Sequence, residues 1–284
     1  MENKKIGMAT KWSFITEIAS KIVSPITNVV LARLLAPDAF GVVATITMII
    51  SLADLFSDAG FQKYLIQAEF KSKKIFENTV NVAFWSNMCI SVFLWIVIII
   101  FRNPIANIVG NPGLGLAVAI ASISLPFTAF SSIQMAIFRR ELDFKTLFWG
   151  RLIGIISPFF VTIPLAFMTH SFWSMIIGTI VMNLLNAVIL TIKSSWKPSL
   201  FFDFSILKDM FSYCSYALIE QLMGWANLNV AIFIIGCFFS PYYLGIFKTS
   251  TAIINQVFAL FTNAITPVLF SSLSKIKHDS REMK

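Results

Sequence analysis

The sequence predicts an all-α membrane protein that crosses the bilayer eight times. Of its 284 residues, 57% are hydrophobic, 13% are charged and 29 are phenylalanine. Several uninterrupted apolar runs reach the ~20 residues needed to span about 30 Å of hydrocarbon. Because backbone polar groups find no water inside lipid, these runs are expected to be helical.

Eight runs qualify as membrane spans, and most of their connections are short. In chain order they cover 10–35, 40–66, 78–101, 114–138, 146–168, 172–192, 210–239 and 242–273. Glu17 and Lys21 interrupt the first run, and no small-residue cleavage site follows it, so a span is favoured over a signal peptide. The glycine-rich segment 110–115 joins the third and fourth spans and is interpreted as a turn. The mixed-charge segment 139–145 is interpreted as a loop that anchors the fifth span.

Lysine and arginine are unevenly distributed over the connections. Eighteen of the 22 lie before the first span or after the second, fourth, sixth and eighth spans, whereas the opposite loops hold only Arg33 and Arg102. Since cytoplasmic loops carry the excess of positive charge, both termini are predicted to be cytoplasmic. The net charge of +8 then reflects topology and attraction to anionic lipid, and it requires no nucleic acid.

Signatures of soluble enzymes are missing from the sequence. It contains no P-loop, HExxH or GxSxG pattern, and it has only two histidines. Cys89, Cys214 and Cys237 fall within spans and lack the spacing of metal ligands. We therefore expect neither catalysis, nor a metal, nor an organic cofactor.

Polar residues recur at helical spacing inside four of the spans. The first span carries Glu17, Ser20, Lys21, Ser24 and Asn28, and the second carries Thr47, Ser51, Asp54 and Asp58. The seventh span carries Tyr213, Tyr216, Glu220 and Asn227. The eighth carries Lys248, Thr251, Asn255, Thr262 and Thr266. Ionisable groups inside a membrane normally face a bundle interior or a watery cavity, so these stripes predict a pathway. The alternative is that the small polar residues join helices and that Glu17 and Lys21 only neutralise each other.

An internal repeat relates the first two spans to the seventh and eighth. Segment 34–41 (LLAPDAFG) corresponds to segment 238–245 (FFSPYYLG), so that Pro37 matches Pro241 and Gly41 matches Gly245. The common offset of six spans retains the orientation in the membrane and predicts two parallel six-helix lobes. The predicted organisation is a first lobe at 1–192, a cytoplasmic connector at 193–209, the first two helices of a second lobe at 210–273, and a basic tail at 274–284.

Several of these segments resemble the polysaccharide exporters and lipid-linked oligosaccharide flippases. The similar segments are 33–41 (RLLAPDAFG), 58–60 (DAG), 64–67 (YLIQ), 139–144 (RRELDF), 244–247 (LGIF) and 267–274 (PVLFSSLS). The resemblance implies two six-helix bundles around a cavity that opens alternately to either side. The family usually has twelve to fourteen spans, so this chain is expected to be a C-terminally truncated member, either a fragment or the product of a disrupted gene.

The resemblance also implies a substrate, an undecaprenyl-pyrophosphate-linked oligosaccharide for O-antigen, capsule or exopolysaccharide synthesis. The residues expected to bind it are Lys21, Asn28, Arg33 and Lys248. Those expected to couple transport to H⁺ or Na⁺ are Glu17, Asp54, Asp58 and Glu220. For Asp54 and Asp58, the alternative is neutralisation of Lys63 or capping of the following loop, and for Lys248 it is pairing with Glu220.

The expected setting is the bacterial inner membrane, with membrane lipids, a polysaccharide polymerase and glycosyltransferases as partners. Two other functions stay open. One is a drug or cation exporter of the same superfamily, which would need acidic residues to dominate its cavity. The other is an inactive remnant or a scaffold in a glycan-synthesis complex.

Overall fold

The computed structural model describes residues 2–255 and 258, without the side chains of residues 2–7, 9, 14, 17, 18, 21 and 22. Within this part of the chain all regular structure is helical, as predicted. The elements are α1 (Glu2–Leu34), α2 (Pro37–Asp58), α3 (Phe61–Gln67), α4 (Lys73–Ile100), α5 (Arg102–Ile108), α6 (Gly115–Ala121), α7 (Ser124–Arg140), α8 (Phe144–Ser157), η1 (Pro158–Thr162), α9 (Ile163–Thr169), α10 (Trp173–Lys193), α11 (Phe204–Phe238) and a helix over 241–255.

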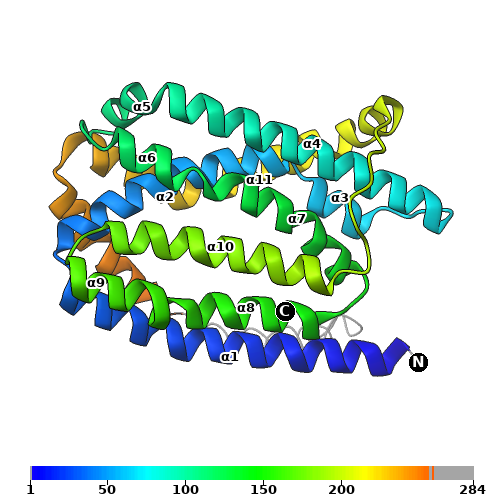
Figure 1. Cartoon of the computed structure of the whole chain (residues 1–284), viewed down its shortest axis with the longest axis horizontal. Helices are drawn as coiled ribbons and strands as arrows, with labels where there is room; N and C mark the ends of the chain where they lie inside the picture. Colours follow the sequence, from blue (N-terminus) through cyan, green and yellow to red (C-terminus); the bar gives the residue numbers. More distant parts are fainter. Residues whose placement is uncertain (1, 256–257, 259–284) are drawn as a thin grey trace, which may run out of the picture.

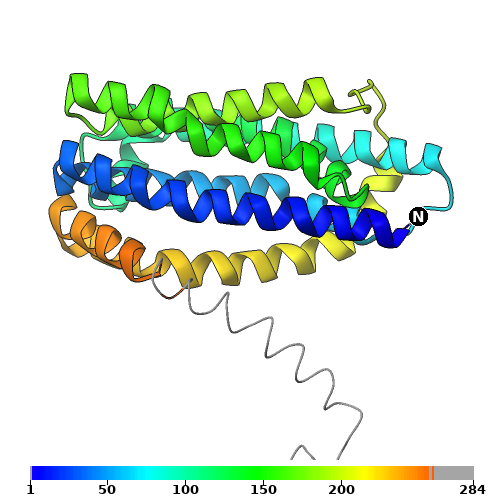
Figure 2. The same ribbon diagram turned by 90° about the horizontal axis from the view of Figure 1, so that it is seen from below.

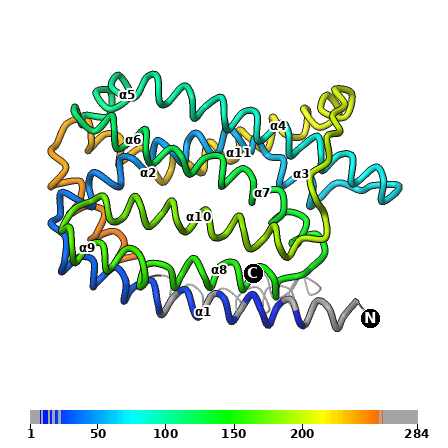
Figure 3. Tube along the Cα trace, viewed as in Figure 1, coloured from blue at the N-terminus to red at the C-terminus, as the bar shows by residue number. Residues whose placement is uncertain are grey.

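The long helices lie side by side with similar axial directions (Figure 1). The N-terminus, α3 and the chain leaving α10 lie at one end, called here the basic end because it carries Arg139, Lys145 and Lys193. The turns after α1 and α11 lie at the other end, called here the proline end after Pro37 and Pro241. Figure 2 shows α11 and the helix after it along one side of the bundle of α1 to α10, and Figure 3 traces the same path.

Among the described residues, six helical segments are long and apolar enough to cross a membrane. They are Pro37–Asp58, Lys73–Ile100, Gly115–Arg140, Phe144–Thr169, Trp173–Lys193 and Phe204–Phe238. In α1 the apolar stretch is Val23–Leu34, and the helix that begins at residue 241 is described as far as 255. A multi-pass membrane protein is therefore confirmed, whereas the count of eight spans stays a prediction.

Three of the predicted spans are interrupted. In the fourth, 114–138, a turn at 122–123 separates α6 from α7. The second, 40–66, is divided because Ala59 (φ 44°) and Gly60 (φ 89°) adopt left-handed backbone conformations between α2 and α3. A Cβ at Gly60 would lie 2.6 Å from the Cβ of Ala217 on α11, so this turn also lets α11 approach closely. The fifth contains the π-helix η1, whose first residue, Pro158, has no amide hydrogen to donate.

Helix α11 begins inside the predicted connector 193–209. The Asp203 carboxylate accepts hydrogen bonds from the backbone amide and the hydroxyl of Ser205, at 2.8 and 2.7 Å. These bonds lower the pKa of Asp203 and satisfy a backbone amide that has no partner within the helix. The cap explains why the helix starts at Phe204, earlier than hydropathy alone predicts.

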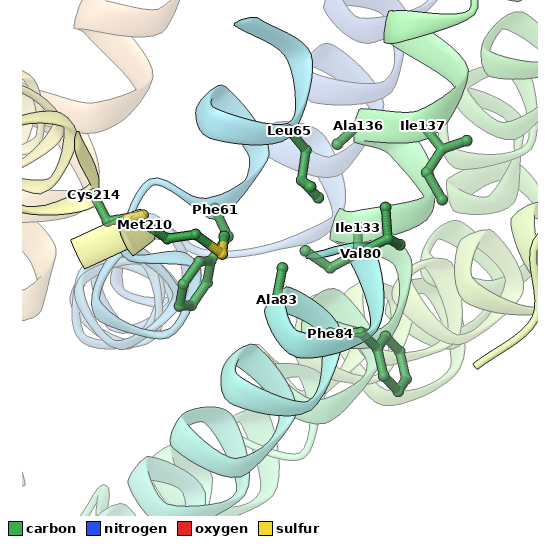
Figure 4. Packing of buried hydrophobic residues seen from close by; sticks show 10 residues of the cluster. All are labelled: Phe61, Leu65, Val80, Ala83, Phe84, Ile133, Ala136, Ile137, Met210 and Cys214. Atoms are coloured by element: carbon green, nitrogen blue, oxygen red, sulfur yellow. The ribbon is translucent and has the colours of Figure 1, made fainter. Parts of the chain in front are cut away.

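The largest apolar cluster lies near the basic end, where α3, α4, α7 and α11 meet (Figure 4). Its members are Phe61, Leu65, Val80, Ala83, Phe84, Ile133, Ala136, Ile137, Met210 and Cys214. Lipid is as apolar as these side chains, so close van der Waals packing rather than removal from water holds the helices together. Through Met210 and Cys214, α11 is thus joined to the first lobe.

The two turns of the predicted repeat pack against each other at the proline end. A Cβ built on Gly41 would lie 1.9 Å from the carbonyl oxygen of Pro241, and one built on Gly245 would lie 1.8 Å from that of Pro37. Each turn therefore presents its glycine to the proline of the other, as expected for a self-complementary contact between related units. The paired turns support the repeat, while two lobes of six helices each stay a prediction.

Candidate functional site

A cavity of about 720 Å³ lies between α1, α7, α8 and α10. We call it the basic cavity, because Arg139 and Arg151 line it. The polar face of α1 supplies most of its hydroxyl and amide groups, from Ser13, Thr16, Ser20, Ser24, Thr27 and Asn28. The polar stripe predicted on the first span therefore does line a cavity, as far as its side chains are described.

The two arginines meet because α8 folds back directly after α7. Asp143 caps α8: its carboxylate accepts from the backbone amide of Thr146 at 3.1 Å and from the hydroxyl of Thr146 at 2.6 Å. The short turn brings Arg151 on α8 near Arg139 at the end of α7, so that their positive charges repel each other. Two like charges lining one cavity favour an anion there, since an anion bound between them offsets the repulsion.

A second cavity, of about 370 Å³, is lined by α2, α4, α7, α10 and α11. We call it the acidic cavity, because Asp54 and Asp58 line it. The Thr128 hydroxyl donates a hydrogen bond of 2.5 Å to Asp54. Met135 and Asn186 line both cavities, which are therefore neighbours.

A buried hydrogen-bond network forms another wall of the acidic cavity. The hydroxyl of Ser57 donates to the side-chain oxygen of Asn87 at 2.5 Å, and the amide nitrogen of Asn87 donates to Ser132 at 2.6 Å. These bonds connect α2, α4 and α7 inside the first lobe. In contrast, Asp58 Oδ1 and Gln221 Nε2 are buried in this cavity without a well-aligned hydrogen bond among the described residues, although the Gln221 side chain faces the Asp58 carboxylate.

The other predicted site residues are distributed along the chain. Glu17 and Lys21 belong to α1, but their side chains lie outside the described set. Arg33 is exposed in the last turn of α1, and Lys248 is partly buried on the helix over 241–255. Neither lines the basic or the acidic cavity, so the structure does not gather the predicted substrate-binding residues in one place.

Glu220 also lies outside both cavities. Its carboxylate pairs with Lys63 at 2.7 Å, and its side chain is 73% exposed. Lys63 therefore pairs with Glu220 on α11 rather than with Asp54 or Asp58, and the partner of Glu220 is not Lys248. The pair joins α3 to α11 on the outside of the described bundle.

The sequence alone did not predict that Arg139 and Arg151 line the same cavity. It assigned Arg139 to a loop that anchors the fifth span and counted Arg151 only as evidence for orientation. A signal was present, since Arg151 is a charge inside an apolar run, which marks a functional position by default. Its partner could not be identified from spacing, because the two residues meet only through the turn between α7 and α8.

Together, the apolar helices and the charged cavities they enclose define a multi-pass membrane protein with a polar interior. The chain belongs to a family of polysaccharide biosynthesis proteins, whose model matches residues 30–284. This confirms the family predicted from the resemblance of the short segments.

Relatives with recorded names are distant in sequence but match almost the whole chain. A membrane protein of the cps region of Klebsiella pneumoniae is 22% identical over 97% of this chain and 57% of its own length. The lipopolysaccharide biosynthesis protein WzxC of Escherichia coli is 22% identical over 99% and 57%. The succinoglycan biosynthesis transport protein ExoT of Rhizobium meliloti is 23% identical over 97% and 55%. The chain thus spans just over half the length of these relatives, and no solved structure matches it.

Proposed function

We propose that the protein is a transporter that takes part in moving an undecaprenyl-pyrophosphate-linked oligosaccharide across the bacterial cytoplasmic membrane. The observation that carries the proposal is the pair Arg139 and Arg151 in a hydroxyl-lined cavity of a polysaccharide biosynthesis family member. One relative is named for succinoglycan transport and another for lipopolysaccharide biosynthesis, and both names fit export of a glycan.

The chemistry of the basic cavity suits the headgroup of such a lipid. Guanidinium groups form strong charge-assisted hydrogen bonds with phosphate oxygens, and both arginines are exposed and so accessible to a headgroup. The hydroxyls of α1 and the amides of Asn28 and Asn186 can bind sugar hydroxyls. A volume of about 720 Å³ lies within the usual range for small-molecule sites.

The remaining parts of the proposed mechanism follow from the arrangement of charges. Lys21, Arg33 and Lys248 would bind the headgroup at other stages of its passage, while the lipid tail stays in the bilayer. Asp54 and Asp58 in the acidic cavity would bind the coupling H⁺ or Na⁺, with Glu17 and Glu220 as further candidates. Rocking of two lobes about the paired turns at the proline end would expose the cavity to either side, with both termini cytoplasmic.

A cation exporter would need the opposite charge in its main cavity. The larger of the two cavities contains two arginines and none of the described acidic residues. This composition favours an anionic headgroup over a cationic drug.

Complementation of a bacterial strain that lacks its own polysaccharide exporter tests the proposal. The wild-type chain should restore surface polysaccharide, and Arg139→Gln or Arg151→Gln should reduce it at least ~10-fold, as expected when a charge-assisted contact worth about 1.5–3 kcal/mol is lost. Arg102→Gln, at an exposed position of α5, is the matched control and should export normally. Failure of the wild-type chain, or export by both cavity variants at the control level, would contradict the proposal.

A further inference from the structure

Arg139 lies between the two cavities and interacts with a charged group on either side. Its guanidinium is repelled by Arg151 in the basic cavity and attracted by Asp58 in the acidic cavity. It also donates a hydrogen bond of 3.3 Å to the side-chain oxygen of Gln62. Gln62 lines the acidic cavity and faces the Asp58 carboxylate, so Arg139 is electrostatically shared by both cavities.

Asp58 has capacity for a further partner. Its Oδ1 is buried without a well-aligned hydrogen bond among the described residues, although the backbone amides of Gly60 and Gln62 and the side chains of Gln62 and Gln221 face the carboxylate. The other titratable groups that interact with it are Asp54 on its own helix and Cys214 on α11. A buried carboxylate oxygen without a partner is costly, so binding of a proton or a monovalent cation at Asp58 would be favourable.

We propose that the charge state of Asp58 controls how tightly the basic cavity binds a diphosphate group, with Arg139 as the residue that connects them. The proposal rests on the proposed function of the basic cavity as a diphosphate site. While Asp58 is charged, it offsets part of the positive charge of Arg139 and repels an anion beside it. Once a proton or cation neutralises Asp58, the positive charge of Arg139 is no longer offset from that side.

Linkage makes this coupling reciprocal. If neutralisation of Asp58 strengthens anion binding, then a bound anion strengthens cation or proton binding at Asp58 by the same factor. Cation or proton and diphosphate would therefore bind cooperatively, each raising the occupancy of the other's site. The expected size is about tenfold, within the usual range of coupling between two sites in one protein.

Binding of inorganic pyrophosphate to the purified 284-residue chain in detergent, measured by calorimetry, tests the coupling. Asp58→Asn should bind pyrophosphate about tenfold more tightly than wild type. Asp209→Asn, which removes an exposed carboxylate of α11, is the matched control and should change the affinity by less than about twofold, because water screens exposed charges. In an Arg139→Gln background, the gain from Asp58→Asn should shrink, because the shared residue is gone.

Asp54→Asn provides a second measurement that does not require the Asp58 variant to fold. Asp54 lies one turn deeper on α2, and its charge opposes the charged form of Asp58. Asp54→Asn therefore favours charged Asp58 and should leave pyrophosphate binding unchanged or weaken it. Unchanged or weaker binding in the folded Asp58→Asn variant overturns the coupling. If the Asp58 variant does not fold, tighter binding in Asp54→Asn overturns it.

The arginine variants separate this failure from failure of the proposed function. If Arg139→Gln and Arg151→Gln weaken pyrophosphate binding while the aspartate variants do not strengthen it, the basic cavity is a diphosphate site without the coupling. If neither arginine variant weakens binding, the assignment of the basic cavity to a diphosphate is wrong.

Discussion

At the scale of single residues, the neighbours Arg139 and Arg140 have different surroundings. Arg139 lines the basic cavity, whereas the guanidinium of Arg140 donates to the carbonyl oxygens of Leu65 and Ala68, each at 2.7 Å. It also lies over the rings of Phe70 and Phe76, 4.8 and 5.2 Å from their centres. Arg140 thus satisfies carbonyl groups at the end of α3, where no helical amide is available. Its role is structural, although the sequence presents the two arginines as equivalent.

Replacing each arginine by lysine should distinguish these roles. Arg140→Lys keeps the charge but loses the planar group that reaches two carbonyls and stacks on two rings, so we expect a loss of about 1–2 kcal/mol in stability. Thermal unfolding in detergent measures it, and the pyrophosphate affinity of the folded variant should stay within about twofold of wild type. A variant with unchanged stability and weakened pyrophosphate binding would place Arg140 in the anion site and contradict this assignment.

The candidate site could be predicted from the sequence only in part. The helical spacing of Ser20, Ser24 and Asn28 correctly indicated one polar face, because periodicity records which side of a helix avoids lipid. Spacing along one helix says nothing about the partner helix, so the approach of Arg151 to Arg139 was not predicted. The surface pair of Lys63 and Glu220 was missed for the same reason, since two separate helices supply it.

At the scale of helices and turns, a reciprocal contact between the two proline-containing turns brings α2 against the helix over 241–255. Glycine is needed at Gly41 and Gly245 because a side chain there would overlap the backbone of the other turn. The conformation of the two glycines does not require it, since neither has a positive φ. The requirement therefore comes from packing between two units far apart in sequence.

Gly41→Ala and Gly245→Ala should each destabilise the protein by about 1–3 kcal/mol, the usual cost of overpacking. The double variant should cost less than the sum, because separating the turns once relieves both overlaps. Thermal unfolding in detergent is the measurement. Gly224→Ala on α11 is the matched control: a Cβ there meets no atom within 4 Å, so its stability should stay the same or rise by up to ~1 kcal/mol. Equal stability of all three single variants would argue against a close contact between the turns.

At the scale of the whole molecule, composition and run length predicted the helical membrane fold. This succeeded because a helix in lipid must satisfy its own backbone and present apolar side chains over ~20 residues, a constraint visible without tertiary structure. The interruptions at Gly60 and Pro158 were not predicted. Hydropathy averages over a window, so it does not register a left-handed turn or a single turn of π-helix inside an apolar run.

The predicted orientation of the molecule rests on its charges, because the basic end carries most of the described lysines and arginines outside the spans. Cysteine labelling in living cells tests it. With Cys89, Cys214 and Cys237 replaced by alanine, single cysteines are introduced by Asn107→Cys on α5 and by Glu141→Cys beyond α7, both at exposed positions at opposite ends.

A membrane-impermeant maleimide should label the Asn107→Cys variant in intact cells, because cytoplasmic loops carry the positive charge and α5 then lies outside. The Glu141→Cys variant should react only after the cells are permeabilised, which also serves as the control that its thiol is accessible. The reverse pattern would place the basic cavity, whose arginines lie near the basic end, toward the exterior. The cavity could then not accept a headgroup from the cytoplasm in the conformation described, so this labelling tests the direction of transport as well as the topology.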